Sequence, residues 1–468
     1  MIRTRIAPSP TGNDIHIGNL YTAMINYCFA KKHQGEFVIR IEDTDQTRLV
    51  KGAEAKILQS LDKYNIISQE NPKKGGPYKP YRQSQRLELY QKYAKQLVES
   101  GHAYYCTCSK ERLDKLRKQA QAQKQIPKYD KYCLSRQQEI RKQINNGQPY
   151  VIRLNVKPNQ TIKFTDIIRG EISFNSSDLD DQVLLKSDGF PTYHLAVVVD
   201  DYLMKISHVI RAEEWLPSTP KHVLLYQALG WEKPQFAHLP ILRNPDRSKL
   251  SKRKNPVWAA WYLEQGFLPE AVLNYLGLLA YSHPENKEIF SLTEFTRILD
   301  LKRIQTTAPI FDINKLTWLN GETIRQLKPQ ELETKILNYL KQFTQIKLTD
   351  KEIKATVPLI QTRIKTLAEY WPLVKFIFEK PSTVEFSLSI LKQQQSELIK
   401  LYEQIDWKHE IIYKSTEQFC QERALKPIKL FMELRYALSN QKVTAPLFES
   451  MEIIGKEQIL KRLKQVLS

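Results

Sequence analysis

The N-terminal part of the chain alternates short strand-like runs with longer segments of helical periodicity. Residues 2–7 alternate apolar and cationic positions, which predicts a strand, and apolar positions recur at helical spacing over about 20–33. A second strand is predicted at 37–41 and a second helix at 51–64. A β-α-β-α order is typical of a parallel sheet, whose ligands bind at the carboxyl ends of the strands.

The middle of the chain interrupts this alternation. After a turn-rich break, a helix is predicted at about 84–100, followed by a basic, Gln-rich segment at 109–142. Short strands are predicted at 150–156 and 161–174, and the β/α pattern then resumes. We therefore predict that residues 83–190 form an insertion in the first domain.

The C-terminal half has a different pattern. After Pro256 the periodicity becomes helical and stays so, with Pro269 at a predicted helix start. Between 331 and 468 nearly every segment has helical periodicity, and Gly is almost absent. The pattern thus predicts an α/β N-terminal part followed by an all-α region.

Positive charge is concentrated in the first two thirds of the chain. The 468 residues carry a formal net charge of +20. Residues 1–330 hold 49 Lys and Arg against 34 Asp and Glu, residues 331–468 hold 22 against 17, and residues 101–150 hold 11 against 4. A basic balance attracts nucleic acid, although Lys-rich surfaces also serve solubility alone. Basic residues interleaved with Tyr and Gln favour the first interpretation.

Cysteine content and hydropathy limit the cellular compartments in which the chain is expected. Its five cysteines are an odd number, which argues against a disulfide framework. Cys28 and Cys420 stand among apolar residues and are predicted to be inert core residues. No N-terminal apolar h-region and no run of about 20 apolar residues is present. We expect a soluble cytoplasmic chain with no membrane partner, or one that entered an organelle before this sequence begins.

Two loop motifs point to nucleotide chemistry. The segment Pro8-Ser-Pro-Thr-Gly-Asn-Asp-Ile-His-Ile-Gly-Asn19 leads into a predicted helix, whose N-terminus favours phosphate. The segment Lys249-Leu-Ser-Lys-Arg253 is a cationic loop able to neutralise phosphate. They resemble the HIGH and KMSKS signatures of class I aminoacyl-tRNA synthetases. The segments 3–12 (Arg-Thr-Arg-Ile-Ala-Pro-Ser-Pro-Thr-Gly) and 40–45 (Arg-Ile-Glu-Asp-Thr-Asp) resemble specifically the bacterial-type glutamyl-tRNA synthetases.

The resemblance extends over essentially the whole chain, and further matching segments lie at 76–86, 209–215, 266–275 and 311–320. It implies an α/β Rossmann-type catalytic domain with an α+β insertion, followed by an all-α C-terminal anticodon-binding region. The implied domains are the first half of the catalytic domain at 1–82, an acceptor-arm-binding insertion at 83–190, the second half of the catalytic domain at 191–255, a stem-contact domain at 256–330 and the anticodon-binding domain at 331–468.

The reaction that the resemblance implies has two steps. The α-carboxylate of L-glutamate attacks the α-phosphate of ATP, supplied with Mg²⁺, and a hydroxyl of the terminal adenosine of tRNA then takes the glutamyl group. The attacking carboxylate is already ionised, so catalysis rests on positioning and charge stabilisation. The resemblance assigns catalysis to His16, Lys249, Lys252 and Arg253, with Lys252 as the main cation. Implied ATP contacts are Thr11, His16, Gly18, Asn19, Glu214, Leu250, Ser251 and Lys252.

The first signature departs from the family pattern in two ways. Three residues separate Gly12 from His16 where the pattern has two, and Asn19 stands where the second His is expected. An isolated His-x-Gly is usually a surface loop, but the flanking Pro-Ser-Pro-Thr-Gly favours the active-site interpretation. Asn19 can donate a hydrogen bond but cannot carry charge, and the extra residue could displace His16.

A glutamate pocket needs at least two cations and one anion, because the substrate has two carboxylates and one ammonium group. The matching segments supply forked donors at Arg5 and Arg211 and a carboxylate at Glu42. Each alone could be structural, since Arg–Glu pairs are common. The full implied set is Arg5, Ala7, Ser9, Glu42, Tyr193, Arg211 and Trp215.

Three of the cysteines resemble the structural zinc site that some members of this family carry in the insertion. Cys106 and Cys108 flank one residue, and Cys133 follows within the same segment. Tyr129 is the better candidate for the fourth ligand, because Ser135 stands where some relatives have His. The alternative is three free thiols.

The expected macromolecular partner is tRNA(Glu), and tRNA(Gln) stays open. In the helical region the resemblance makes Arg363, Lys426 and Arg435 the implied anticodon contacts, although a single Arg on a helix is usually solvated. We expect a monomer.

Three other functions remain open. A truncated relative glutamylates a modified tRNA base, but it lacks a helical anticodon region. Glutaminyl-tRNA synthetases normally begin the first signature with Pro-Glu-Pro, and their anticodon region is a β-barrel. An inactive paralogue that only binds RNA would explain the irregular first signature.

Overall fold

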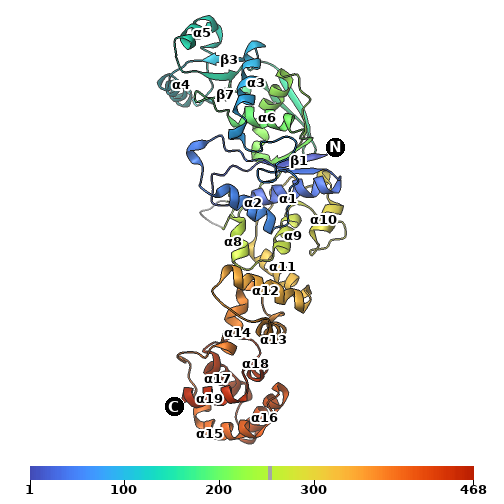
Figure 1. Cartoon of the computed structure of the whole chain (residues 1–468), viewed down its shortest axis with the longest axis vertical. Helices are drawn as coiled ribbons and strands as arrows, with labels where there is room; N and C mark the ends of the chain where they lie inside the picture. Colours follow the sequence, from blue (N-terminus) through green and yellow to red (C-terminus); the bar gives the residue numbers. More distant parts are fainter. Residues whose placement is uncertain (251–255, 468) are drawn as a thin grey trace. The chain divides into compact units, whose positions relative to one another are not determined.

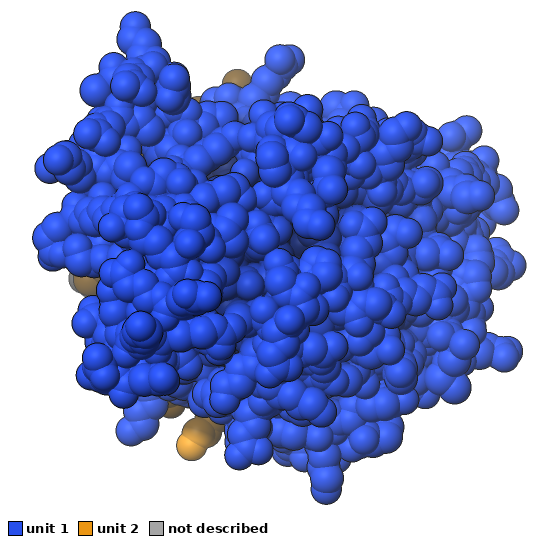
Figure 2. Space-filling model, turned by 90° about the horizontal axis from the view of Figure 1, so that it is seen from above, with its two compact units in different colours: residues 1–261, 273–312 blue, residues 262–272, 313–468 orange. Residues whose placement is uncertain are grey.

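The computed structural model describes residues 1–250 and 256–467, with side chains described through residue 465 (Figure 1). The chain forms two compact units (Figure 2). Unit 1 comprises Met1–Trp261 with Leu273–Asp312, and unit 2 comprises Tyr262–Val272 with Ile313–Ser468. The domain boundaries expected from the sequence stay predictions, because this division does not separate the insertion from the rest of unit 1.

Unit 1 begins with the predicted β-α-β-α order. The elements are β1 (Arg3–Ile6), α1 (Ile17–Lys32), β2 (Glu36–Ile39) and α2 (Ala53–Lys63). Strands β1 and β2 pair in parallel, as predicted. Helix α1 begins earlier than the apolar periodicity indicates, because His16 serves as its N-cap and its side chain accepts a hydrogen bond from the Gly18 N–H.

A four-stranded sheet follows in the order β6-β5-β9-β8. Its strands and the associated helices are β5 (Thr161–Asp166), β6 (Gly170–Asn175), α6 (Tyr193–Leu203), β8 (His208–Ala212), α7 (Thr219–Ala228) and β9 (Gln235–Leu239). The single strand predicted at 161–174 is in fact the β5–β6 hairpin, whose turn at 167–169 leads into Gly170 with φ of 78°. The start of β8 lies beside β1, because the N–H of Ser207, the residue before β8, donates to the Arg3 carbonyl at 3.0 Å.

The insertion carries a small antiparallel sheet in the order β3-β4-β7. Its elements are α3 (Leu87–Glu99), β3 (Ala103–Cys106), α4 (Lys110–Ala122), α5 (Gln137–Asn145), β4 (Val151–Leu154) and β7 (Val183–Leu185). A local core of Tyr104, Cys106, Tyr129, Cys133 and Ile140 lies beneath it. The large core of unit 1 instead lies around α3, α6 and the four-stranded sheet.

Beyond β9 the described residues form helices, as predicted. These are α8 (Ala259–Glu264), α9 (Pro269–Ala280), α10 (Leu292–Ile298), α11 (Ile313–Gln326), α12 (Pro329–Phe343), α13 (Asp350–Ile360), α14 (Tyr370–Phe378), α15 (Ser389–Gln404), α16 (His409–Glu422), α17 (Pro427–Ser439), α18 (Leu447–Ile454) and α19 (Lys456–Leu467).

The helices of unit 2 share one core, which contains buried apolar side chains from α12 through α19. Cys420 is fully buried there, and Cys28 is fully buried in unit 1, so both are the core residues that the sequence predicts. Among the residues described, no helix has the length and apolar character needed to cross a membrane.

Candidate active site

A cleft of about 670 Å³ opens at the carboxyl ends of β1, β2 and β8. This is where a parallel sheet is expected to bind its ligands. All residues of the predicted glutamate pocket line it, namely Arg5, Ala7, Ser9, Glu42, Tyr193, Arg211 and Trp215. Thr11, Asn19 and Glu214 from the predicted ATP set line the same cleft.

One side of the cleft is a network of paired charges. Arg5 donates from Nε and Nη2 to the two carboxylate oxygens of Asp201, each at 3.1 Å. Arg40, which is fully buried, donates to Asp201 at 2.7 Å and to Glu42 at 3.1 Å. Its Nε also lies 3.5 Å from Asp200. Each guanidinium here therefore has a carboxylate partner.

The Glu42 carboxylate lines the cleft, and its pKa is higher than that of an ordinary glutamate side chain. Burial raises the pKa of Glu42 above its usual value, and the Arg40 and Arg5 guanidinium groups only partly offset this effect. A buried carboxylate with a raised pKa favours a cationic partner. The ammonium group of an amino acid is such a partner.

The opposite side of the cleft holds Arg211, whose partners are all neutral. Its Nη1 donates to the Tyr193 hydroxyl at 3.1 Å, its Nη2 to Thr219 Oγ1 at 2.9 Å and its Nε to His238 Nε2 at 3.1 Å. Longer contacts of 3.3 Å reach His222 Nδ1. Among the described residues, no carboxylate pairs with this buried guanidinium. Its charge therefore remains available to a ligand.

Tyr193 and Trp215 form the aromatic wall beside Arg211. Their ring centroids lie 4.3 Å apart with an interplanar angle of 34°. Because the Tyr193 oxygen accepts from Arg211, its own hydrogen can be donated into the cleft. The wall thus adds one hydroxyl donor to the guanidinium.

The first signature forms the loop that enters α1. His16 Nδ1 accepts from the Gly18 N–H at 3.0 Å, so the neutral imidazole carries its hydrogen on Nε2. Gly12 lies against the indole of Trp258, where an added Cβ would come within 2.4 Å of the ring. The loop therefore requires glycine at this position.

The additional residue of the first signature is accommodated by an anchored loop. Asp14 accepts from the Ser60 hydroxyl at 2.7 Å and from the Ala260 N–H at 2.7 Å. Ile15 is 1% exposed. These contacts hold the segment before His16, which still caps α1.

The second signature is described only in its first part. The side chains of Lys249 and Glu214 form an ion pair, which places Lys249 at the wall of the cleft that Glu214 lines. Leu250 is buried. Ser251, Lys252 and Arg253 lie outside the described residues.

Several cleft residues were missed by sequence reasoning. Thr44 and Asp45 belong to the matching segment at 40–45 and Arg48 follows it, and all three line the cleft, so their proximity to Glu42 was a usable signal. Lys186 comes from the end of the insertion and donates to the Thr44 carbonyl at 3.3 Å. No local pattern at Lys186 indicated this position.

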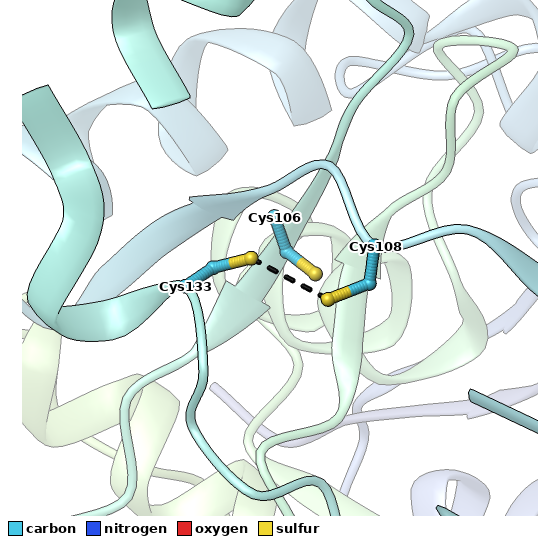
Figure 3. A group of neighbouring side chains, drawn as sticks. All are labelled: Cys106, Cys108 and Cys133. Atoms are coloured by element: carbon cyan, nitrogen blue, oxygen red, sulfur yellow. Dashed lines mark hydrogen bonds between the residues drawn. The ribbon is translucent and has the colours of Figure 1, made fainter. Parts of the chain in front are cut away.

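The three cysteines of the predicted zinc site converge in the insertion (Figure 3). Their sulfur atoms all lie within 4.8 Å of one another, and Cys108 and Cys133 are 3.5 Å apart. The Tyr129 hydroxyl lies 3.5 Å from the Cys106 sulfur and 3.2 Å from the Cys108 sulfur. The structure therefore brings together all four predicted ligands.

This donor set fits a tetrahedral thiolate-rich metal site. The contact with Cys133 and the Tyr129 hydroxyl lower the pKa of the Cys106 thiol despite its burial, whereas the contact with Cys106 and burial raise the pKa of the Cys133 thiol. The Arg153 guanidinium lies 4.1 Å from the Tyr129 ring centroid and adds positive charge beside the sulfurs. Thiolates close to a cation are the form that binds zinc.

The predicted anticodon residues lie in unit 2. Arg363 is exposed, and Lys426 is exposed as the N-cap residue of α17. Arg435 is partly buried, and its pKa is lowered by burial and by the nearby charge of Arg363. Two of the three predicted cations therefore lie close enough to repel each other, which is an arrangement that favours an anionic partner.

Comparison with known proteins identifies the family. The family model for the catalytic domain of class I tRNA synthetases (E and Q) matches residues 1–318, and an anticodon binding domain model matches residues 331–467. The chain belongs to the class I tRNA synthetases of the E and Q type.

Full-length relatives agree with this assignment. The glutamate–tRNA ligase of Acidothermus cellulolyticus is 43% identical over 99% of this chain and 95% of the relative. That of Pseudomonas savastanoi pv. phaseolicola is 43% identical over 100% of this chain and 95% of the relative. A crystal structure of a glutamate tRNA ligase from Elizabethkingia meningosepticum, in complex with its amino acid, superposes with a TM-score of 0.89 at 35% identity. The superposition covers 100% of this chain and 99% of the Elizabethkingia chain.

Proposed function

We propose that this chain is an ATP-dependent glutamate–tRNA ligase. It joins L-glutamate to the 3′ end of tRNA(Glu) through a glutamyl-adenylate and releases diphosphate and AMP. Family membership makes the chain an aminoacyl-tRNA synthetase, and the relatives that match its full length are named for glutamate. Cytoplasmic location and a monomeric state stay predictions.

The observation that carries the choice of glutamate is the buried guanidinium of Arg211, which has neutral hydrogen-bond partners and no carboxylate partner in the part of the chain that the structure describes. A buried cation without a carboxylate partner binds a substrate carboxylate more strongly than a neutral amide. Arg211 and Tyr193 would hold the side-chain carboxylate of glutamate. Glu42, with the Ser9 hydroxyl and the Ala7 carbonyl, would hold the ammonium group, and Arg5 would lie near the second carboxylate.

The α-phosphate of ATP must then lie beside the α-carboxylate of glutamate. His16 caps the start of α1, and Asn19 and Thr11 line the cleft. Lys249 would exchange its contact with Glu214 for the phosphates, and we assign the main catalytic charge to Lys252, with Arg253 beside it. Mg²⁺ enters with ATP and neutralises part of the phosphate charge.

A structural zinc ion is the second part of the proposal. Cys106, Cys108 and Cys133 supply three thiolates, and Tyr129 is the fourth ligand that lies within reach. The ion would stabilise the insertion, which we expect to contact the acceptor arm of tRNA. Metal analysis should find one zinc per chain, and Cys106→Ser should lose it.

Tyr129→Phe separates the two roles of the tyrosine. The variant keeps the ring that stacks on Tyr104 and the contact with Arg153, but lacks the hydroxyl. Weaker zinc retention in this variant supports Tyr129 as a ligand. Full retention assigns the fourth position to another group, and no zinc in freshly purified protein supports three free thiols.

The helical unit argues against two alternatives. Within residues 313–467 the structure shows helices and no strand, so the β-barrel expected of a glutaminyl-tRNA synthetase is absent from this region. The same helices are missing from the truncated relative. We infer that Arg363, Lys426 and Arg435 contact the anticodon.

Aminoacylation of separate tRNA(Glu) and tRNA(Gln) transcripts tests the proposal directly. Charging of tRNA(Glu) with glutamate is the expected result. Charging of tRNA(Gln) as well would add a second tRNA substrate to the proposed function. Exchange between ATP and diphosphate, measured with tRNA present, separates an enzyme from an inactive RNA-binding paralogue. Activation of glutamine in preference to glutamate would overturn the assignment.

A further inference from the structure

We propose that His238, oriented by Asp166, is a positioning residue that holds the Arg211 guanidinium for the substrate carboxylate without neutralising its charge. This inference rests on the proposed function and assigns a role to residues outside the predicted pocket. The two residues lie on neighbouring strands, Asp166 at the end of β5 and His238 on β9, behind Arg211 on β8.

The hydrogen-bond pattern fixes the protonation of His238. Asp166 Oδ2 lies 2.6 Å from His238 Nδ1, and the carboxylate also accepts from the backbone N–H groups of His238, Ile168 and Arg169. An ionised carboxylate can only accept, so Nδ1 carries the hydrogen. The lone pair on His238 Nε2 is then free to accept from Arg211 Nε at 3.1 Å.

The surroundings keep this arrangement in one charge state. Burial raises the pKa of Asp166, but the hydrogen bonds from His238 and the backbone outweigh this effect and hold it below its usual value. Burial, with the nearby Arg211 charge, lowers the pKa of His238 to about 4, although Asp166 opposes the shift. His238 is therefore neutral at physiological pH, and its acceptor atom always faces Arg211.

A second imidazole, that of His222, accepts hydrogen bonds from the other edge of the guanidinium. His222 Nδ1 accepts from Nη1 and Nη2 of Arg211, each at 3.3 Å. Its Nε2 lies 3.1 Å from His194 Nδ1, to which it donates. Thr219 Oγ1 lies 2.9 Å from Arg211 Nη2 and 3.1 Å from His238 Nε2, which ties the groups together.

The interposed ring explains how a buried cation can be both fixed and unneutralised. A carboxylate in direct contact would orient Arg211 equally well but would cancel its charge. His238 instead places an imidazole between Asp166 and the guanidinium. A pocket built in this way favours glutamate over glutamine, because only the carboxylate supplies the missing negative charge.

A matched pair of substitutions at His238 tests the inference. The side-chain oxygen of His238→Gln can occupy the place of Nε2 and accept from Arg211, whereas His238→Asn is too short to do so and keeps only a donor for Asp166. Glutamate activation is measured by ATP–diphosphate exchange with tRNA(Glu) present, varying glutamate and ATP separately. His102→Asn, at an exposed histidine bonded to Ser100, serves as the control.

We expect His238→Asn to raise the KM for glutamate roughly tenfold to a hundredfold, the scale of one hydrogen bond to a charged group. The KM for ATP should stay the same, and the preference for glutamate over glutamine should fall. His238→Gln should recover most of the loss. Equal behaviour of the two variants, or a parallel change in both KM values, would assign His238 a purely structural role.

Thr219 provides a second test if His238→Asn does not fold, as judged by thermal unfolding. Thr219→Ser keeps the hydroxyl that bridges Arg211 and His238, while Thr219→Val keeps the shape and loses it. Only Thr219→Val should weaken glutamate binding. A wild-type protein that does not activate glutamate would remove the proposed function together with this inference, whereas an active wild type with unaffected variants would remove the inference alone.

Discussion

The two sides of the cleft differ in the charge of the groups that contact a buried arginine. Arg5 shares the carboxylate of Asp201 with Arg40, in a network where each guanidinium meets an acid. Arg211 meets a phenol, a hydroxyl and two imidazoles instead. Breaking the first arrangement is costly for the fold, because it leaves a buried charge with fewer partners. The second leaves a charge for the ligand.

This difference separates stability from recognition within one pocket. Removing Arg5 leaves a buried carboxylate with one partner fewer, so the cost falls mainly on folding, in addition to the proposed contact of Arg5 with the second carboxylate of glutamate. Removing Arg211 leaves only neutral groups behind, so the cost falls on binding. The following predictions test this division.

Arg5→Gln should have the largest effect of these variants. We expect it to lower the free energy of unfolding. Breaking a buried pair by removing one partner costs about 3–5 kcal/mol, which here is reduced because Arg40 still contacts Asp201. Urea unfolding should show a clear drop in the midpoint. Arg5→Gln combined with Asp201→Asn should recover part of it, and an unchanged midpoint in the single variant would contradict the role given to this pair.

Arg211→Gln should raise the KM for glutamate by roughly a hundredfold, because a buried hydrogen-bonded charge pair contributes about 2–5 kcal/mol. The midpoint of urea unfolding should change little, since no carboxylate loses its partner. Exchange kinetics at varied glutamate and ATP measure the effect. A variant that binds glutamate normally but unfolds easily would reverse the comparison between the two arginines.

The pH dependence of glutamate binding should follow Glu42. Burial raises the pKa of Glu42 above its usual 4.5, so as the pH falls this carboxylate becomes protonated at a higher pH than an exposed glutamate does. The KM for glutamate should therefore rise on the acidic side, while the KM for ATP should not follow. Glu42→Gln should show a higher KM at neutral pH and should lack this acidic limb.

The smallest effect is expected at the rim of the cleft. Lys249 and Glu214 form an ion pair between partly exposed side chains, and such pairs contribute less than about 1 kcal/mol. Glu214→Gln should leave the unfolding midpoint unchanged and alter the KM for ATP by no more than about threefold. A large loss of stability would mean that the rim, like the Arg5 side, is part of the structural network.

The sequence by itself determined the elements that carry the chemistry. The alternation of apolar positions predicted β1, α1, β2 and α2 and the helical C-terminal region, since periodicity reflects which face of each element is buried. It also placed the glutamate residues in matching segments that the structure gathers in one cleft. The resemblance of the segments around Cys106, Cys108 and Cys133 to a zinc site of the family predicted that these cysteines lie together, and the structure brings their sulfur atoms together.

Only the tertiary structure decided what surrounds these residues. The partner of Arg5 is Asp201 and that of Arg211 is His238, on elements far away in the chain, so no local pattern connects them. The pairing of β8 with β9 and of β9 with β5 brings Arg211, His238 and Asp166 into one line. A guanidinium therefore acquires its function from the charge of its partners, which strand packing sets and local sequence does not.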